Sequence, residues 1–161
     1  MSTYYIKNIW GPGGQNGYPQ KDQIEFAQGQ EGAARRFSKC DGFLLYETGH
    51  CECNKIGAKS IYARGIIALP EIFSNGDTKE YGESIGANRR KFPYSVKINL
   101  SKRANSLDGV PLDKIRKIIK KPKETMQRPG GLVKITKEQF DTFCLELEKS
   151  IKSQNYESRR D

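Results

Sequence analysis

Aromatic and hydrogen-bonding side chains follow one another at the start of the chain, in Tyr4-Tyr5-Ile6-Lys7-Asn8-Ile9-Trp10. The apolar run is interrupted at Lys7-Asn8 and ends at Gly11-Pro12-Gly13-Gly14. Aromatic faces stack on flat heterocycles, and lysine and asparagine supply hydrogen bonds to the edge of such a ring. These residue types therefore favour binding of a nucleobase over catalysis.

Other aromatic residues near predicted strand ends could line the same pocket: Tyr18, Tyr46, Phe92 and Tyr94. Tyr46 and Phe92 fit a buried core equally well. Trp10 differs because it precedes a glycine-rich loop and no helical or strand pattern buries it. Base–aromatic stacking contributes on the order of 1–3 kcal/mol per base, so two rings and two hydrogen bonds make a usable pocket.

Lys7 and Glu47 each end a predicted strand and could face one another across a cavity. Two interpretations stay open for this pair, a structural ion pair and an acid–base pair whose pKa values are shifted by burial. The sole histidine, His50, lies in a loop, which argues against a serine-type catalytic triad. The sequence therefore predicts a domain that is not an enzyme.

Positive charge is concentrated in one part of the chain, which carries a net charge of +9 overall. Between Ser101 and Ile135 ten basic residues stand against three acidic ones, a local excess of +7. A concentrated basic patch displaces counterions from a phosphate backbone and so binds nucleic acid. A solvated lysine-rich surface is the alternative. The ten are Lys102, Arg103, Lys114, Arg116, Lys117, Lys120, Lys121, Lys123, Arg128 and Lys134.

Two motifs that could hold a cofactor are incomplete. The run Gly11–Gly17 lacks the Gly-Lys-Ser/Thr ending of a phosphate-binding loop. His50-Cys51-Glu52-Cys53, with Cys40 upstream, forms one compact cluster where structural zinc sites usually show paired knuckles. We therefore expect reduced thiols, no metal and no cofactor.

The length of 161 residues suits one domain with a single core, which we expect over residues 1–152, followed by a polar tail over 153–161. No run approaches the ~20 apolar residues that span a bilayer. The first residues lack the basic and apolar regions of a secretory signal, so a cytoplasmic protein is expected.

Strands and short helices alternate in the predicted order. Thr136 and Gln139 match a capping box at the start of the last helix, whose apolar face includes Phe143 and Leu147. The pattern predicts an α+β domain with a curled sheet or small barrel. Strands are expected at 3–9, 43–46, 56–69 (broken at Gly57 and Gly65), 92–100 and 132–135, helices at 31–40, 111–120 and 136–152, and long polar segments at 11–30 and 70–91.

Several blocks in this order resemble the EVE domain family. They are Tyr4-Tyr5-Ile6-Lys7-Asn8, then Gly32-Ala33-Ala34-Arg35-Arg36-Phe37 with Asp41-Gly42-Phe43-Leu44-Leu45-Tyr46, the glycine-containing strand Ile56–Ile67, and Met126–Thr136 before the last helix. The family belongs with the YTH and ASCH domains to the PUA-like superfamily of small barrels. The resemblance implies a small curled β-barrel with short flanking helices.

The resemblance also implies positions for a base-binding pocket. Lys7 and Asn8 would form its floor, Trp10 or Tyr18 one wall, and Tyr94 a further wall. Tyr46 with Glu47 would complete the lining. Phosphate contacts, which set the register of the strand, would come from the basic helix and its surroundings: Arg89, Arg90, Lys117, Lys120, Lys121 and Arg128.

We therefore expect a non-catalytic domain that captures a flipped, modified base, with DNA preferred, in the cytoplasm. EVE-like domains also serve as specificity modules of modification-dependent restriction enzymes, so a fused or recruited nuclease is a further expected partner. Three alternatives stay open. They are an RNA reader, an ASCH-like hydrolase of modified nucleosides that uses Lys7, Glu47 and Thr48, and an interaction module for an acidic protein.

Overall fold

The structure is a computed structural model that describes residues 2–10, 13–15, 17–20, 22–49, 57–74, 92–120 and 131–160, with 154–160 as backbone only. Within these ranges no helix is both long and apolar enough to cross a bilayer. Element boundaries and contacts below refer to this part of the chain.

One mixed sheet organises the described residues, with strand order β2-β5-β4-β3-β1-β7. β1 (Tyr4–Ile9) pairs in parallel with β3 (Gly42–Glu47) and antiparallel with β7 (Leu132–Ile135). β4 (Ser60–Ser74), β5 (Tyr94–Arg103) and β2 (Gln23–Phe26) continue the sheet antiparallel, and β6 (Val110–Pro111) adds to β4. β1 therefore lies inside the sheet, with a strand on each side.

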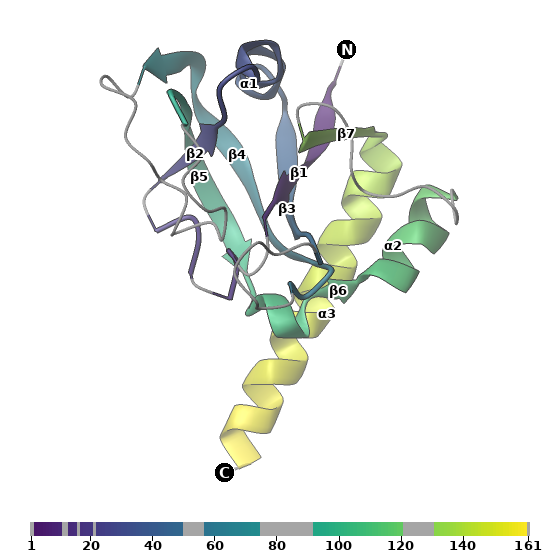
Figure 1. The fold of residues 1–161 in the computed structure, drawn as a ribbon. Helices are drawn as coiled ribbons and strands as arrows, with labels where there is room; N and C mark the ends of the chain where they lie inside the picture. Colours follow the sequence, from purple (N-terminus) through teal and green to yellow (C-terminus); the bar gives the residue numbers. More distant parts are fainter. Residues whose placement is uncertain are drawn as a thin grey trace.

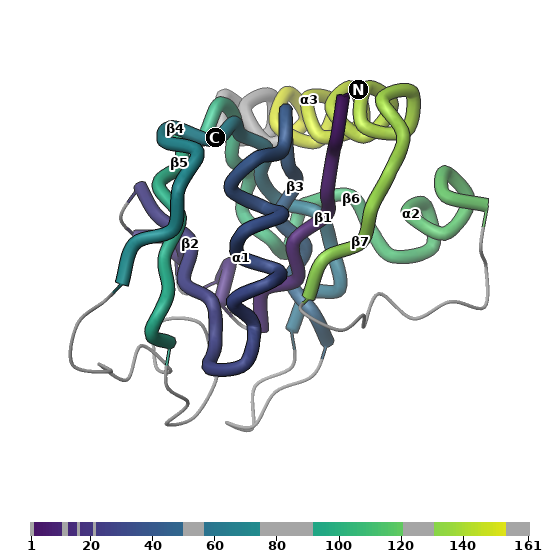
Figure 2. Tube along the Cα trace, turned by 90° about the horizontal axis from the view of Figure 1, so that it is seen from above, coloured from purple at the N-terminus to yellow at the C-terminus, as the bar shows by residue number. Residues whose placement is uncertain are grey.

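Helices cover both faces of the curled sheet. α1 (Glu31–Phe37) lies inside the curl, between the β2, β5 and β4 side and the β1 and β7 side (Figure 2). α2 (Leu112–Ile119) and α3 (Lys137–Arg160) pack on the outside, and α3 runs on past the sheet (Figure 1). A short 3-10 helix, η1 (Ser106–Asp108), connects β5 to β6.

Two apolar clusters follow from this arrangement. The first core cluster lies inside the curl around α1, and the rings of Phe26, Phe37 and Phe43 follow one another there at centroid distances of 5.4 and 5.0 Å. The second core cluster lies between the sheet and α2 and α3, and includes Ile6, Ile115 and Phe143. Successive apolar residues of β1 belong to different clusters, because side chains alternate between the two faces of a strand.

Side-chain contacts across the interior show how strongly the sheet curls. Lys7 of β1 places its Nζ atom 4.7 Å from the ring centroid of Phe26 of β2. These strands are separated by β3, β4 and β5 in the sheet order. A flat sheet would keep them far apart, so the contact defines a half-barrel.

Most of the predicted elements are confirmed. β7 has the predicted bounds, and α1 begins at Glu31 as expected. The capping box at α3 forms in both directions, with Gln139 N donating to Thr136 Oγ1 at 3.1 Å and Thr136 N donating to Gln139 Oε1 at 2.9 Å. The predicted α+β class with a curled sheet is correct.

Two expectations need correction. Residues 11–30 were expected to form one polar loop, but Gln23–Phe26 forms β2, paired to β5 from Gln23↔Lys97 to Phe26↔Tyr94. The backbone of residues 153–160 continues α3, where a separate polar tail was expected. The loop that contains His50 and most of the polar segment expected at 70–91 lie outside the described residues, although Pro70–Ser74 belongs to β4.

Gly65 marks a close backbone approach in β4, as its place in the strand pattern predicts. The register between β4 and β5 shifts between Arg64 and Gly65. A Cβ atom at Gly65 would lie 2.5 Å from the carbonyl oxygen of Asn99 and 2.7 Å from the Phe43 ring. No other residue type fits without displacement of the neighbouring strand.

Gly65→Ala is therefore expected to lower the free energy of unfolding by about 1–3 kcal/mol through overpacking. Gly32→Ala is the matched control, because a Cβ atom there meets only the flexible end of Arg36 at 3.6 Å. It should raise stability by about 0.5–1 kcal/mol, the gain of alanine over glycine inside a helix. Urea unfolding of both variants measures the difference, and equal effects would contradict this account of the strand.

Candidate nucleic-acid interface

Lys7 is a buried amine on the inner face of the curled sheet, with 6% of its surface exposed. Its Nζ atom donates a hydrogen bond to the carbonyl oxygen of Asn8 at 3.1 Å and lies over the Phe26 ring. Within the described part of the chain no carboxylate lies within ion-pairing distance of it. The amine therefore has donor capacity that a ligand could use.

Burial lowers the pKa of Lys7 to about 8. The cause is desolvation, which disfavours the charged form of an amine surrounded by apolar groups. A perturbed pKa in the interior of a small domain is a typical sign of a functional group. Near neutral pH this lysine changes between a cation and a neutral amine more readily than a surface lysine does.

Gly131 makes room for the Lys7 amine just before β7. A Cβ atom at this position would lie 3.0 Å from Lys7 Nζ and 3.8 Å from the carbonyl oxygen of Asn8. Its φ angle of +68° also belongs to the left-handed region that favours glycine. The end of the lysine is thus bordered by β1, by Phe26 and by a residue without a side chain.

Asn8 and Trp10 lie beside Lys7 in the chain, as the pocket hypothesis requires. Asn8 is buried, and its carbonyl oxygen holds the lysine amine. Trp10 is half-buried and packs against the first core cluster, and its carbonyl oxygen accepts a hydrogen bond from Gly13 N at 2.8 Å. In β1 Lys7 pairs with Leu45 and Asn8 pairs with Tyr46, so alternation turns the Asn8 side chain to the face of the sheet opposite the lysine. The lysine amine and the Trp10 indole share the inner side, and Asn8 contributes its carbonyl oxygen there. Their role in binding stays a prediction.

Glu47 is fully buried, and its carboxylate is occupied by local donors. Oε1 accepts from Gln15 N at 2.9 Å and Ser106 Oγ at 3.2 Å, and Oε2 accepts from Gln15 Nε2 at 2.9 Å and Ala58 N at 2.6 Å. No described ion pair joins it to Lys7. The structure therefore does not form the Lys7–Glu47 pair that the sequence left open, and Glu47 fixes three loop segments.

Tyr18 is a buried anchor, 3% exposed, in the loop before β2. Its hydroxyl group donates to Glu25 Oε2 at 2.5 Å and accepts from Glu25 N at 2.9 Å, while its carbonyl oxygen accepts from Tyr62 Oη at 2.9 Å. Burial, with the neighbouring Glu25 carboxylate, raises the pKa of Tyr18. Through the bonds of its hydroxyl group to Glu25, the Tyr18 side chain supports β2.

Tyr46 lies on the other face of the sheet from Lys7. It belongs to the second core cluster, whereas its neighbour Leu45 belongs to the first. Burial raises the pKa of Tyr46 to about 12, opposed by the nearby Arg116 of α2. The structure does not bring this tyrosine to the lysine, because alternation along β3 turns it towards the helices.

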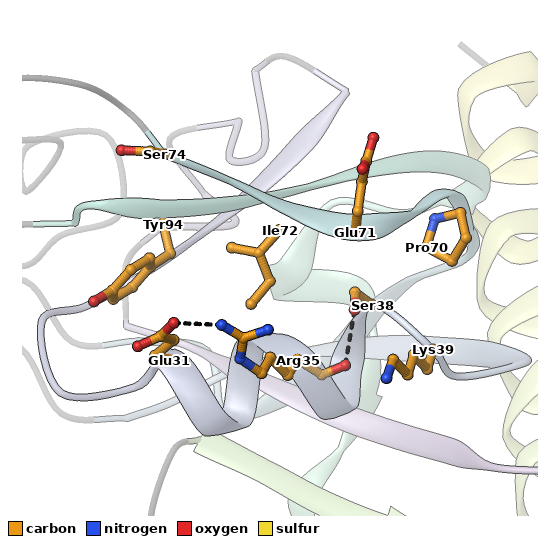
Figure 3. Close-up of a pocket in the computed structure, with 9 residues that line it drawn as sticks. All are labelled: Glu31, Arg35, Ser38, Lys39, Pro70, Glu71, Ile72, Ser74 and Tyr94. Atoms are coloured by element: carbon orange, nitrogen blue, oxygen red, sulfur yellow. Dashed lines mark hydrogen bonds and ion pairs between the residues drawn. The ribbon is translucent and has the colours of Figure 1, made fainter.

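Tyr94 lines a groove between α1 and the end of β4, with a cavity volume of about 380 Å³ (Figure 3). Glu31, Arg35 and Lys39 come from α1 and the residues after it, and Ile72 and Ser74 come from β4. Tyr94 also pairs with Phe26 across β5 and β2, and Phe26 supports Lys7. The groove and the lysine site therefore share the inner side of the curled sheet.

The basic residues divide between structural and exposed positions. Arg103 holds the glycine-rich loop, since it donates from Nη1 to Pro19 O at 3.0 Å and from Nη2 to Gly17 O at 2.8 Å. Lys114 pairs with Glu146 at 2.6 Å. Lys117 of α2 and Lys120 at its C-terminal end are exposed, and α2 lies outside the curl (Figure 2). The other predicted phosphate contacts, Arg89, Arg90, Lys121 and Arg128, lie outside the described residues.

The metal hypothesis depends on residues outside the described ranges, namely His50, Cys51 and Cys53. Cys40 is a buried free thiol, and burial raises its pKa to about 12. The described residues contain no group of three His, Cys, Asp or Glu side chains placed to hold an ion.

Sequence reasoning missed three residues of the site: Phe26, Gly131 and Arg35. Phe26 belongs to the strand that the polar composition of its surroundings concealed. Gly131 stood in the closing block of the resemblance, where Pro129-Gly130-Gly131 marks a turn, but nothing in the sequence tied it to Lys7. Arg35 stands in the quoted block around α1, and its spacing of four residues from both Glu31 and Lys39 could have indicated one charged helix face.

Solved structures with the same fold are known, at very low sequence identity. The YTH domain of Mmi1 in complex with RNA has a TM-score of 0.60 at 10% identity, over 95% of this chain and 82% of that one. A second complex of YTH domain-containing protein mmi1 with RNA has a TM-score of 0.57 at 9% identity, over 95% and 85%. A mutant ASCH protein from Zymomonas mobilis has a TM-score of 0.50 at 11% identity, over 86% and 92%.

No family model and no curated protein matches the sequence. The structural likeness nevertheless defines the class of fold. The curled sheet with α1 inside it and α2 and α3 outside is similar in fold to these YTH and ASCH structures.

The burial of Lys7 has a consequence for stability. An unfolded lysine keeps its proton up to about pH 10.5, whereas the folded one releases it at about pH 8. Between these values the unfolded state binds more protons, so stability rises with pH. This difference in pKa corresponds to a gain of about 3 kcal/mol in the free energy of unfolding between about pH 8 and pH 10.5.

Lys7→Met should remove this pH dependence and stabilise the protein at pH 7, because a neutral chain of similar length replaces a desolvated cation. Urea unfolding of both proteins from pH 7 to pH 10 measures the difference, which should shrink as pH rises. A constant difference across this range would mean that Lys7 titrates as an ordinary lysine.

Proposed function

We propose that this domain is an EVE-type reader that binds a nucleic-acid strand and holds one flipped, modified base between Trp10 and the Lys7 amine. The observation that carries the proposal is the buried Lys7, whose pKa is lowered to about 8 and whose amine has no described carboxylate partner. Such an amine is costly to keep in a core. A ligand that accepts its hydrogen bonds accounts for its presence.

The surroundings of the amine suit a nucleobase. Phe26 forms an apolar floor 4.7 Å from the Lys7 Nζ atom, and Trp10 supplies an indole on the same side of the sheet. Lysine donates to carbonyl and ring-nitrogen acceptors on base edges, while stacking tolerates any base. Extrusion of a base costs a few kcal/mol, which stacking and hydrogen bonding together offset.

Two forms of the proposal differ in the polymer that is bound. The DNA form is supported by the sequence blocks that resemble EVE domains. In this form the domain acts as the specificity module of a modification-dependent restriction system, with a fused or recruited nuclease. The RNA form is supported by the similar YTH structures that contain RNA. In both forms the domain holds the base without transforming it.

The test is a binding comparison on matched oligonucleotides that carry no modification, N6-methyladenine, 5-methylcytosine or 5-hydroxymethylcytosine. Single and double strands of DNA and RNA are compared at two salt concentrations. We expect at least a tenfold preference for one modification, about 1.4 kcal/mol, that persists at the higher salt. Trp10 is the single tryptophan, so quenching of its fluorescence reports stacking directly.

Lys7→Met and Trp10→Ala should each remove the preference. Lys137→Met makes the same change at an exposed position at the start of α3 and should keep the preference. Leu107→Ala, which removes exposed apolar surface, should keep it as well. Equal binding of all strands that collapses with salt would show a phosphate surface without a reading pocket. That result would overturn the proposal.

A hydrolase of modified nucleosides is the second candidate, and one observation favours it. A lysine with a pKa near 8 can accept a proton close to neutral pH, which a general base requires. The engaged carboxylate of Glu47 leaves this lysine without the expected acidic partner. Turnover of N-acylated or N-methylated nucleosides that is lost in Lys7→Met would support this function, and complete inactivity would remove it.

A further inference from the structure

The groove between α1 and β4 has the size and lining of a ligand site. Its volume of about 380 Å³ falls in the range of about 300–1,000 Å³ that small-molecule pockets occupy. One side is formed by α1 and the residues after it, and the other by the end of β4 with Tyr94 of β5 (Figure 3). A flat ring with a polar edge is the shape that such a cleft accepts.

Apolar surface in the groove comes from Tyr94 and Ile72. Both side chains are half-buried and pack against the first core cluster, so their positions are set before a ligand arrives. A fixed tyrosine ring is a stacking platform that costs little conformational entropy on binding.

The polar edge of the groove is an ion pair on α1. Arg35 Nη2 lies 2.6 Å from Glu31 Oε1, and the two side chains are 66% and 49% exposed. Figure 3 shows the pair on the α1 side, facing Ile72, while the carboxylate of Glu71 points away from it. The pair thus presents guanidinium donors directly beside carboxylate acceptors.

This order of donors and acceptors matches guanine at the largest number of atoms, because uracil and thymine carry only the acceptor O4 beside the donor N3–H. Guanine carries the acceptors N7 and O6 followed by the donors N1–H and N2–H₂ along its edge, and arginine pairs with N7 and O6 in a bidentate way. Adenine would set its N1 acceptor against the carboxylate. Cytosine is smaller and offers a single donor at N4.

We propose that the groove binds a guanine base that stacks on Tyr94 and is read by Arg35 at N7 and O6 and by Glu31 at N1–H and N2–H₂. The guanine belongs to the strand whose modified base occupies the Lys7 site, and in this respect the inference rests on the proposed function. Tyr94 and Phe26 are paired residues of neighbouring strands, and Phe26 supports Lys7. The groove is therefore placed to read a base flanking the captured one.

The experiment measures fluorescence anisotropy of labelled strands that carry the preferred modification in an adenine and thymine context. Guanine is placed in turn at the two positions on each side of the modified base. Guanine at one position should tighten binding about tenfold over adenine, a bidentate contact's contribution. Replacement of that guanine by 7-deazaguanine, which lacks N7, should abolish most of this gain in affinity.

Arg35→Ala should lose most of the guanine preference, with the part read by Glu31 left, and become insensitive to 7-deazaguanine, since the two changes remove the same contact. Arg36→Ala is the matched control, because Arg36 is an exposed neighbour on α1 that does not line the groove. Tyr94→Ala should weaken binding of every strand with a base in the groove, and Tyr94→Phe should restore it. All these positions are partly or fully exposed, so the variants are expected to fold.

Three outcomes would overturn the proposal: equal binding of guanine and adenine at all four positions, a preference for cytosine, or equal effects of Arg35→Ala and Arg36→Ala. Tight binding of free guanosine monophosphate, unaffected by an attached strand, would overturn the strand assignment. The two sites remain distinguishable. Lys7→Met should remove the preference for the modification and leave the guanine preference, and unmodified strands test the guanine preference even if no modification is preferred.

Discussion

The desolvation of Lys7 is the constraint around which this domain is organised. β1 passes through the interior of the sheet with β3 and β7 on either side, and alternation along the strand turns Lys7 into the curl. There the Phe26 ring, the Asn8 carbonyl and the bare backbone of Gly131 surround its amine. None of these groups repays the hydration that a cation loses. A stability cost maintained at one position is typical of binding sites, which trade stability for function.

Glu47 shows the opposite solution to the same problem at the carboxyl end of β3. Its buried carboxylate receives hydrogen bonds from Gln15, Ala58 and Ser106, so the charge is compensated and three loop segments are tied to the sheet. Ser60 adds a hydrogen bond from its hydroxyl group to the Ser106 carbonyl. The Glu47 carboxylate thus fixes the frame, whereas the Lys7 amine has the Asn8 carbonyl oxygen as its described hydrogen-bond acceptor. Substitutions of Glu47 would be expected to be tolerated poorly.

Local rules were sufficient for much of the fold and for part of the site. Alternation, the capping box at Thr136 and the order of the blocks led to the α+β curled sheet, because each is encoded in neighbouring residues. β2 was missed because its short sequence gains its conformation from pairing with β5, a tertiary effect. In the candidate site, Lys7 could be singled out by its residue type. Tyr46, which was expected to line the same pocket, follows Leu45 in β3 and therefore faces the helices. The groove with Arg35 required α1 and β4 to meet, which no local pattern shows.

The most direct test of the central claim is an NMR titration of the Lys7 side chain, with the Lys7→Met variant to assign its signal. The account predicts a pKa of about 8 for the free protein. It also predicts that a strand with the preferred modified base raises this pKa, since a base acceptor stabilises the protonated amine. Affinity should then fall as pH rises above 8. A pKa near 10.5 in the free protein, or one that the bound strand leaves unchanged, would contradict the account.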